Sequence, residues 1–194
     1  MTDTKIISNK YTMPILSVKA KTIVTVVSVA LAILLPQLVH MIGISLGSGS
    51  ALGEIILPMH LPVILAGLVA GPYVGLITGF LAPIISFGIT GMPGMVILPF
   101  ITIELAVYGF LAGVMSNVKI NVMSKVLIAQ IVGRVVRALA ILAAVYIMGN
   151  NAVKVSIIWT SIKTGFVGII LQWALIPVVV MIVRKVIDNE RSAN

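Results

Sequence analysis

Six long apolar runs follow one another along this chain, and they constrain its fold more than any other feature. A helix needs about 20 mainly apolar residues to cross the hydrocarbon core of a bilayer. Short segments rich in glycine, serine, asparagine or proline separate the runs, as turns do. Because lipid offers no partner to backbone polar groups, each run is predicted to be a helix. The expected spans are 22–46, 55–71, 73–89, 95–115, 126–148 and 157–183.

Composition agrees with a bilayer environment. Only 9% of the residues are charged and 60% are hydrophobic, whereas about a quarter of a soluble domain is charged. We therefore predict an all-α integral membrane protein, a bundle of six transmembrane helices that forms a single membrane domain over residues 1–194. The first run is too long for the apolar part of a signal peptide, so we expect it to remain as a span. The net charge of +8 does not indicate a nucleic-acid partner, because the basic residues form no patch with interleaved aromatics.

The distribution of lysine and arginine predicts the orientation, since short cytoplasmic segments carry the excess of positive charge. With six spans, the N-terminal segment 1–21, the loop between the fourth and fifth spans and the tail 184–194 fall on one side. Their basic residues are Lys5, Lys10, Lys19, Lys21, Lys119, Lys125, Arg184, Lys185 and Arg191. The loops of the other side hold only Glu54 and Lys154. Both termini are therefore expected in the cytoplasm.

Ionisable side chains inside the spans are functional candidates, because each costs about 2.5–3.5 kcal/mol on insertion. With a helical rise of about 1.5 Å per residue, four such groups from four different spans fall in the outer half of the membrane. Arg134 lies one turn deeper than Arg137 on the same helix face. A shared cavity that opens outward would explain the set. The candidate substrate-binding residues are His60, Glu104, Tyr108, Arg134, Arg137, Trp159 and Lys163.

Each of these residues also has a structural interpretation. Glu104 and Arg137 can form a pair that locks two neighbouring helices, His60 can bond to another helix, and Lys163 can extend to the outer interface. However, one carboxylate cannot neutralise the two guanidiniums of Arg134 and Arg137, and the excess positive charge favours an anionic or carbonyl-rich ligand. Both interpretations can hold together. Tyr146, at a similar depth, fits an interfacial aromatic belt.

Small residues recur at every fourth position in the second and third spans, and more weakly in the first. Such a face lets helices approach closely where lipid provides no hydrophobic drive for association. The face serves either packing within the bundle or contact with another membrane protein. The residues are Ser28, Ala32, Gly67, Gly71, Gly75 and Gly79.

The sequence lacks the motifs of an enzyme. It contains no phosphate-binding G-x-x-x-x-G-K-[ST] loop, no H-E-x-x-H pair and no cysteine. We therefore predict no catalytic activity, no cofactor and no metal site. If the protein moves a solute uphill, the energy has to come from an ion gradient or from another subunit.

The stretch "GEIILPMHLPVILAGLVAGPYVGLITGFLAPIISFGITGMPG", followed by "ELAVYGFLAG", resembles the substrate-binding S components of energy-coupling factor (ECF) transporters. These transporters are vitamin-uptake ABC importers of prokaryotes. The resemblance is clear over residues 53–113. It extends more loosely to the whole chain, which has the size and the six spans of that family. It implies a protein of the prokaryotic plasma membrane that binds a vitamin or vitamin precursor near the outer face, with a gating loop at about residues 47–57.

The resemblance also implies partners, namely a membrane coupling subunit and two cytoplasmic ATPase subunits. In that family the first three helices meet the coupling subunit, often through an A-x-x-x-A pattern in the first. Ser28 and Ala32 are the nearest match here. The glycines at 67, 71, 75 and 79 are therefore the stronger candidates for contact with the coupling subunit. The excess positive charge near the arginines fits a carboxylate or a ring with many acceptor atoms. Pantothenate, a pyridoxine or hydroxymethylpyrimidine ring, and cobalamin are therefore candidate cargoes.

The main alternative is a stand-alone secondary transporter or channel for a small organic solute. Such a protein needs a polar path through both halves of the membrane. In the inner half the predicted spans offer only Arg134 and Gln172, which disfavours this alternative.

Overall fold

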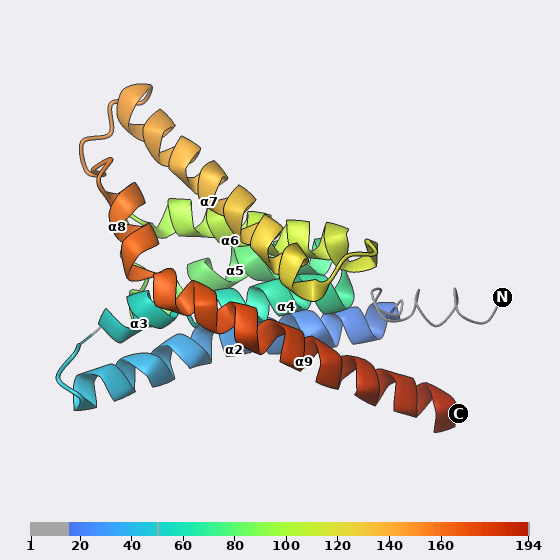
Figure 1. Ribbon diagram of the computed structural model, residues 1–194. Helices are drawn as coiled ribbons and strands as arrows, with labels where there is room; N and C mark the ends of the chain where they lie inside the picture. Colours follow the sequence, from blue (N-terminus) through green and yellow to red (C-terminus); the bar gives the residue numbers. More distant parts are fainter. Residues whose placement is uncertain (1–15, 50, 194) are drawn as a thin grey trace.

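The computed structural model describes residues 16–49 and 51–193, which are helical apart from their connections (Figure 1). Six of the described helical segments are long and apolar enough to cross a membrane, so the prediction of an all-helical protein with six spans is confirmed. The elements are α2 (Val18–Ser45), α3 (Ala51–Ile56), α4 (His60–Ala70), α5 (Pro72–Thr90), α6 (Leu98–Val114), the 3₁₀ turn η1 (Met115–Asn117), α7 (Val122–Tyr146), α8 (Ile157–Thr164) and α9 (Phe166–Ala193).

The run expected as one span over 157–183 is divided into two helices. The eight residues of α8 are too few to cross the bilayer, and α9 provides the span. Gly165 stands at the break, where an added Cβ would lie 2.8 Å from Leu57 Cδ1 and 3.0 Å from the Ser161 carbonyl oxygen. A glycine at this position leaves room for the Leu57 side chain at the break.

The second span is also interrupted, at the connection between α3 and α4. Leu57 has a positive φ of 52°, and Pro58 disfavours helical geometry at the residue before it. The segment expected as a gating loop over 47–57 contains a short helix, α3, which precedes α4 in the chain.

Glycines hold the centre of the bundle together, where α4, α5 and α6 meet. A Cβ on Gly75 would collide with the backbone of Gly109, and one on Gly79 would collide with the Leu105 carbonyl. Likewise, a Cβ on Gly67 would meet the backbone of Gly109 and Gly113. These three helices approach one another backbone to backbone, which is how small residues stabilise helix pairs in lipid.

The small residues predicted for a partner surface thus pack largely within the chain itself. Gly67, Gly75 and Gly79 are buried among α4, α5 and α6, and Ser28 and Ala32 are buried on the inner face of α2. Gly71, at the α4–α5 turn, is partly exposed. Packing within the bundle, the alternative stated above, is what the structure shows at the five buried positions, and contact with a partner stays a prediction.

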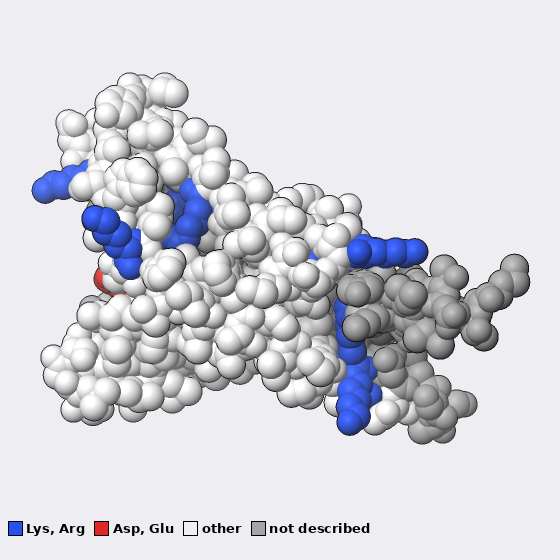
Figure 2. All heavy atoms as spheres, viewed as in Figure 1, with Lys and Arg blue, Asp and Glu red and all other residues white. Residues whose placement is uncertain are grey.

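The two ends of the bundle differ. Helix α2 begins and α9 ends at one end, and the α6–α7 connection lies there too (Figure 1). Lysine and arginine gather at this end, while at the opposite end they lie around and inside a hollow beside α7 and α8 (Figure 2). The side chains of Lys5, Lys10 and Arg191 lie outside the described residues. That the first end faces the cytoplasm remains a prediction from the charge distribution.

Replacement of Gly75 by alanine tests the glycine contact. We expect Gly75→Ala to destabilise the protein by about 1–3 kcal/mol, because the new methyl group overpacks the α5–α6 contact. Gly88→Ala on the same helix is the matched control, since nothing lies within 4 Å of a Cβ there. Thermal unfolding in detergent measures both variants. Equal midpoints would show that the close approach of α5 and α6 does not contribute to stability.

Candidate functional site

A cavity of about 420 Å³ lies at the end of the bundle that carries α3 and α8. Helix α2 and α3 form one side of it, and α7 and α8 form another. The connection between α3 and α4, the first residue of α4, Ser86 of α5, the loop before α6 and the start of α6 complete the lining. Its polar and charged lining residues are Gln37, His40, Glu54, His60, Ser86, Arg134, Arg137, Thr160, Ser161 and Thr164. A cavity of this size is typical of small-molecule sites.

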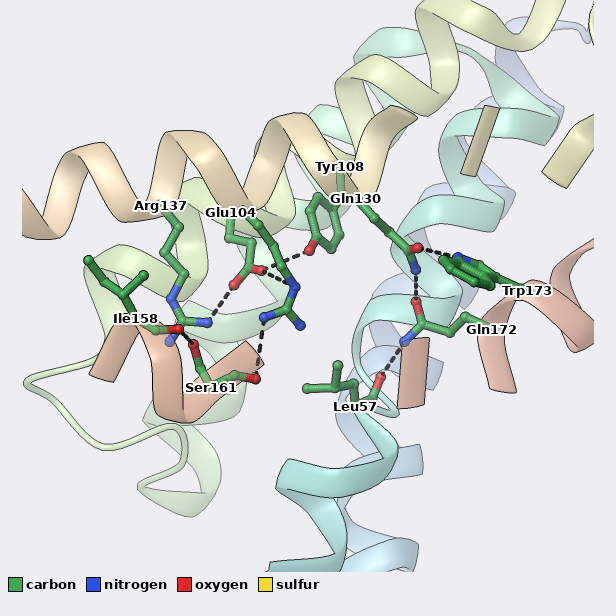
Figure 3. A network of polar contacts seen from close by, with 10 residues as sticks. Leu57, Glu104, Tyr108, Gln130, Arg137, Ile158, Ser161, Gln172 and Trp173 are labelled. Carbon is green, nitrogen blue, oxygen red and sulfur yellow. Dashed lines mark hydrogen bonds and ion pairs between the residues drawn. The ribbon is translucent and has the colours of Figure 1, made fainter. Parts of the chain in front are cut away.

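Glu104 is the centre of a buried ionic cluster beneath the cavity. Its side chain, on α6, is 0% exposed. Arg137 Nη1 donates to Glu104 Oε2 at 2.7 Å, and the Tyr108 hydroxyl donates to Oε1 at 2.8 Å (Figure 3). Arg134 Nε lies 3.8 Å from the same Oε1. The carboxylate thereby joins α6 to α7, and the two guanidiniums extend to the cavity.

Arg134 also connects this cluster to α8. Its Nη1 donates to the Ser161 carbonyl oxygen at 3.3 Å (Figure 3). Glu104 is the only acidic group within ion-pair distance of Arg134 and Arg137 among the described residues. Two positive charges therefore share one buried negative charge. Glu54, the acidic residue in the described lining, is exposed on α3.

His60 brings an imidazole to the cavity at the first residue of α4. It is only 6% exposed, and neither ring nitrogen has a hydrogen-bond partner in the described part of the chain. The ring lies 5.5 Å from that of Tyr108, measured between centroids. Pro58 and Pro62 flank it, and proline is tolerated in a first helical turn because the early N–H groups have no helical acceptor. The imidazole thus lies at the cavity with neither ring nitrogen partnered among the described residues.

Trp159 and Lys163 do not join this set. Both are exposed, Trp159 by 68%, and neither lines the cavity. The reason is the helical period of α8, which turns Ile157, Thr160, Ser161 and Thr164 toward the cavity and leaves the residues at 159 and 163 on the opposite face. Tyr108 is buried behind His60, and Tyr146 is exposed, as expected for an interfacial residue.

Two polar residues of α2 were missed by sequence reasoning. Gln37 and His40 line the cavity from the side of α2, and Gln37 Nε2 and His40 Nδ1 are buried without a hydrogen-bond partner among the described residues. The available signal was an ionisable residue inside the first apolar run, which applies to His40 as it does to His60.

A chain of amide groups anchors the break between α3 and α4. Trp173 Nε1 donates to Gln130 Oε1 at 2.6 Å, and Gln130 Nε2 donates to Gln172 Oε1 at 2.8 Å. Gln172 Nε2 then donates to the Leu57 carbonyl oxygen at 3.3 Å (Figure 3). Helices α7 and α9 thereby hold the residue at which the second span is interrupted, next to the cavity.

Comparison with known proteins gives one match. The family model described as "ECF transporter, substrate-specific component" matches residues 20–180. No curated protein and no solved structure matches the chain significantly. The family match covers most of the chain and confirms the resemblance noted in its sequence.

Glu104→Gln tests the ionic cluster. We expect the variant to lose about 3–5 kcal/mol of stability, because the buried guanidinium of Arg137 and the partly buried one of Arg134 are left without a countercharge. Glu54→Gln is the matched control, since that carboxylate is exposed and its loss should change stability by less than about 0.5 kcal/mol. Thermal unfolding in detergent without added ligand measures both. A Glu104→Gln variant as stable as the control would contradict the role of the cluster.

Gln172→Leu tests the anchor on Leu57. The change removes one of the two donors to the Leu57 carbonyl oxygen and leaves the Gln130 amide without its acceptor, and we expect a cost of about 1–3 kcal/mol. It should also speed hydrogen exchange at the His60 amide, which donates to the Leu57 carbonyl oxygen at 3.2 Å. The Gln130→Leu/Gln172→Leu double variant should lose less than the sum of the single variants, because the two residues share one hydrogen bond. Full additivity would contradict the network.

Proposed function

Because this chain belongs to the family of substrate-specific (S) components of ECF transporters, we propose that the cavity between α2 and α7 holds the transported cargo. Members of this family are non-catalytic substrate-binding membrane subunits of prokaryotic plasma membranes. The cargo class and the role of each lining residue are our proposal. The residues that we assign to binding are His60, Arg134 and Arg137, with Glu104 and Tyr108 positioning them.

The observation that carries this assignment is the set of unpaired polar atoms around the cavity. Buried polar groups in proteins nearly always have hydrogen-bond partners. Here both nitrogens of His60 and Nε of Arg137 have none among the described residues, although all three atoms belong to residues of the cavity lining. A ligand with both acceptor and donor groups would satisfy them, and burial would make each such bond strong.

Charge and volume narrow the cargo. The buried cluster of Glu104, Arg134 and Arg137 carries one net positive charge, which favours a carboxylate or a ring rich in acceptor atoms. The cavity of about 420 Å³ suits a short chain or a single ring. Pantothenate and a pyridoxine or hydroxymethylpyrimidine ring therefore fit better than cobalamin, whose corrin is far larger.

We also propose that uptake is driven by a membrane coupling subunit and two cytoplasmic ATPases. The chain has no phosphate-binding loop of its own, so ATP hydrolysis requires other subunits. A stand-alone transporter or channel is disfavoured by the polar groups on the far side of the cavity. Gln130 and Gln172 are 3% and 1% exposed and bond to each other, so they offer no hydrated path toward the end where α9 terminates.

Native mass spectrometry of the purified protein and titration calorimetry test the binding site. We expect a retained small molecule, and we expect Arg134→Gln to weaken its binding by about tenfold or more, because a charge-assisted hydrogen bond is lost. Arg134 is preferred to Arg137 for this test, since its 3.8 Å contact with Glu104 is longer and its removal disturbs the fold less. Lys154→Gln, an exposed basic residue at the same end, is the control. Unchanged affinity in Arg134→Gln would place the cargo elsewhere.

A further inference from the structure

The cavity has two polar walls of different chemistry. The wall from α7 presents the guanidiniums of Arg134 and Arg137, and the wall from α2 presents Gln37 and His40. Helix α2 packs against α3, α4 and α5, whereas α7 packs against α6 and α9. The two helices lie apart in the bundle (Figure 1) and both line the cavity, so a ligand that touches both must be extended.

The wall from α2 is built to bind a neutral polar group. Gln37 and His40 are three residues apart and share one helix face. Gln37 Nε2 and His40 Nδ1 are buried and have no hydrogen-bond partner among the described residues. The His40 ring packs directly on Gly53, where a Cβ would collide with it, so the imidazole has a fixed position. An amide nitrogen only donates, while an imidazole nitrogen donates or accepts, and a hydroxyl group matches both.

The charge around the cavity fixes the direction of the ligand. Glu54 lies on α3 beside the α2 wall and repels a carboxylate there, while the arginines of α7 attract one. Between the two walls Met59, Ile97 and Ile101 give the lining an apolar part, beside the polar His60 and Ser86. The middle of the ligand is therefore expected to include a carbon chain that buries apolar surface.

We propose that the cargo is an extended hydroxy carboxylate, with its carboxylate on Arg134 and Arg137 and its hydroxyl end on Gln37 and His40. This inference rests on the proposed function and deepens it by naming the substrate class. Of the candidates above, pantothenate has this arrangement, with a carboxylate at one end and two hydroxyl groups at the other. A pyridoxine-type ring has hydroxyl groups and no carboxylate.

Titration calorimetry with three probes separates the two ends of the cavity. The probes are pantothenate, the alcohol panthenol, which lacks the carboxylate, and dideoxypantothenate, which lacks both hydroxyl groups. We expect Gln37→Leu to weaken binding of pantothenate and panthenol by about tenfold and to leave dideoxypantothenate unaffected. Arg134→Gln should show the opposite selectivity, with loss for the two carboxylates and none for panthenol. His40→Phe keeps a ring on Gly53 and provides a second variant with the selectivity of Gln37→Leu.

Three results would overturn the proposal. If Gln37→Leu and His40→Phe bind pantothenate as tightly as the unchanged protein does, the α2 wall has no role in binding. A loss of pantothenate affinity in Arg134→Gln would then still support the cavity as the cargo site. Equal losses for all three probes would mean that the α2 variants act through the fold. If none of the probes binds the unchanged protein, the hydroxy carboxylate assignment is wrong, and a different molecule retained on purification would still support the cavity as the cargo site.

Discussion

The buried carboxylate of Glu104 is the interaction on which the cavity depends. It holds Arg137 at 2.7 Å and Arg134 at 3.8 Å, and it accepts a hydrogen bond from Tyr108, whose ring supports His60. A single fully buried group thus sets the position of both cationic residues and of the imidazole. Because a buried charge without a partner is costly, this arrangement is held firmly before any ligand arrives. Preorganised donors lose little conformational entropy on binding, which favours affinity.

The opposite boundary of the site depends on a break in a helix. Leu57 stands between α3 and α4 with a positive φ, and its carbonyl oxygen accepts hydrogen bonds from Gln172 and from the His60 amide. Strained backbone of this kind persists where the surroundings determine it. Gly165 allows α8 to lie against the same leucine, so the break in the second span and the break in the sixth fit together. The two interruptions open the end of the bundle and leave room for a solute.

The amino-acid sequence determined the larger features through apolar length and through charge. Six runs of sufficient length predict six spans, and the matching depths of Glu104 and Arg137 predict that they lie near each other. The orientation of α8 could not be predicted, because Gly165 resembles any other glycine in an apolar run, and the helix period of 157–164 is set only once the chain breaks there. For the same reason the sequence predicts Trp159 and Lys163 at the site, on the basis of one continuous helix over 157–183, whereas the structure places them outside the cavity lining. The glycine series predicts a close contact but not its partner, which is α6 for Gly67, Gly75 and Gly79.

The geometry of the bundle also limits the routes that a solute could take through it. The cavity opens at the end that carries α3 and α8, and beneath it lie Glu104, Tyr108 and the amide chain of Gln130 and Gln172, all nearly fully buried. Farther along, glycine contacts bring α4, α5 and α6 backbone to backbone, which leaves no space for a solute between them. Passage through the centre would require breaking the ionic cluster and separating these helices. The chain has no nucleotide-binding motif of its own, and under the proposed function the energy for release at the other side is proposed to come from partner subunits.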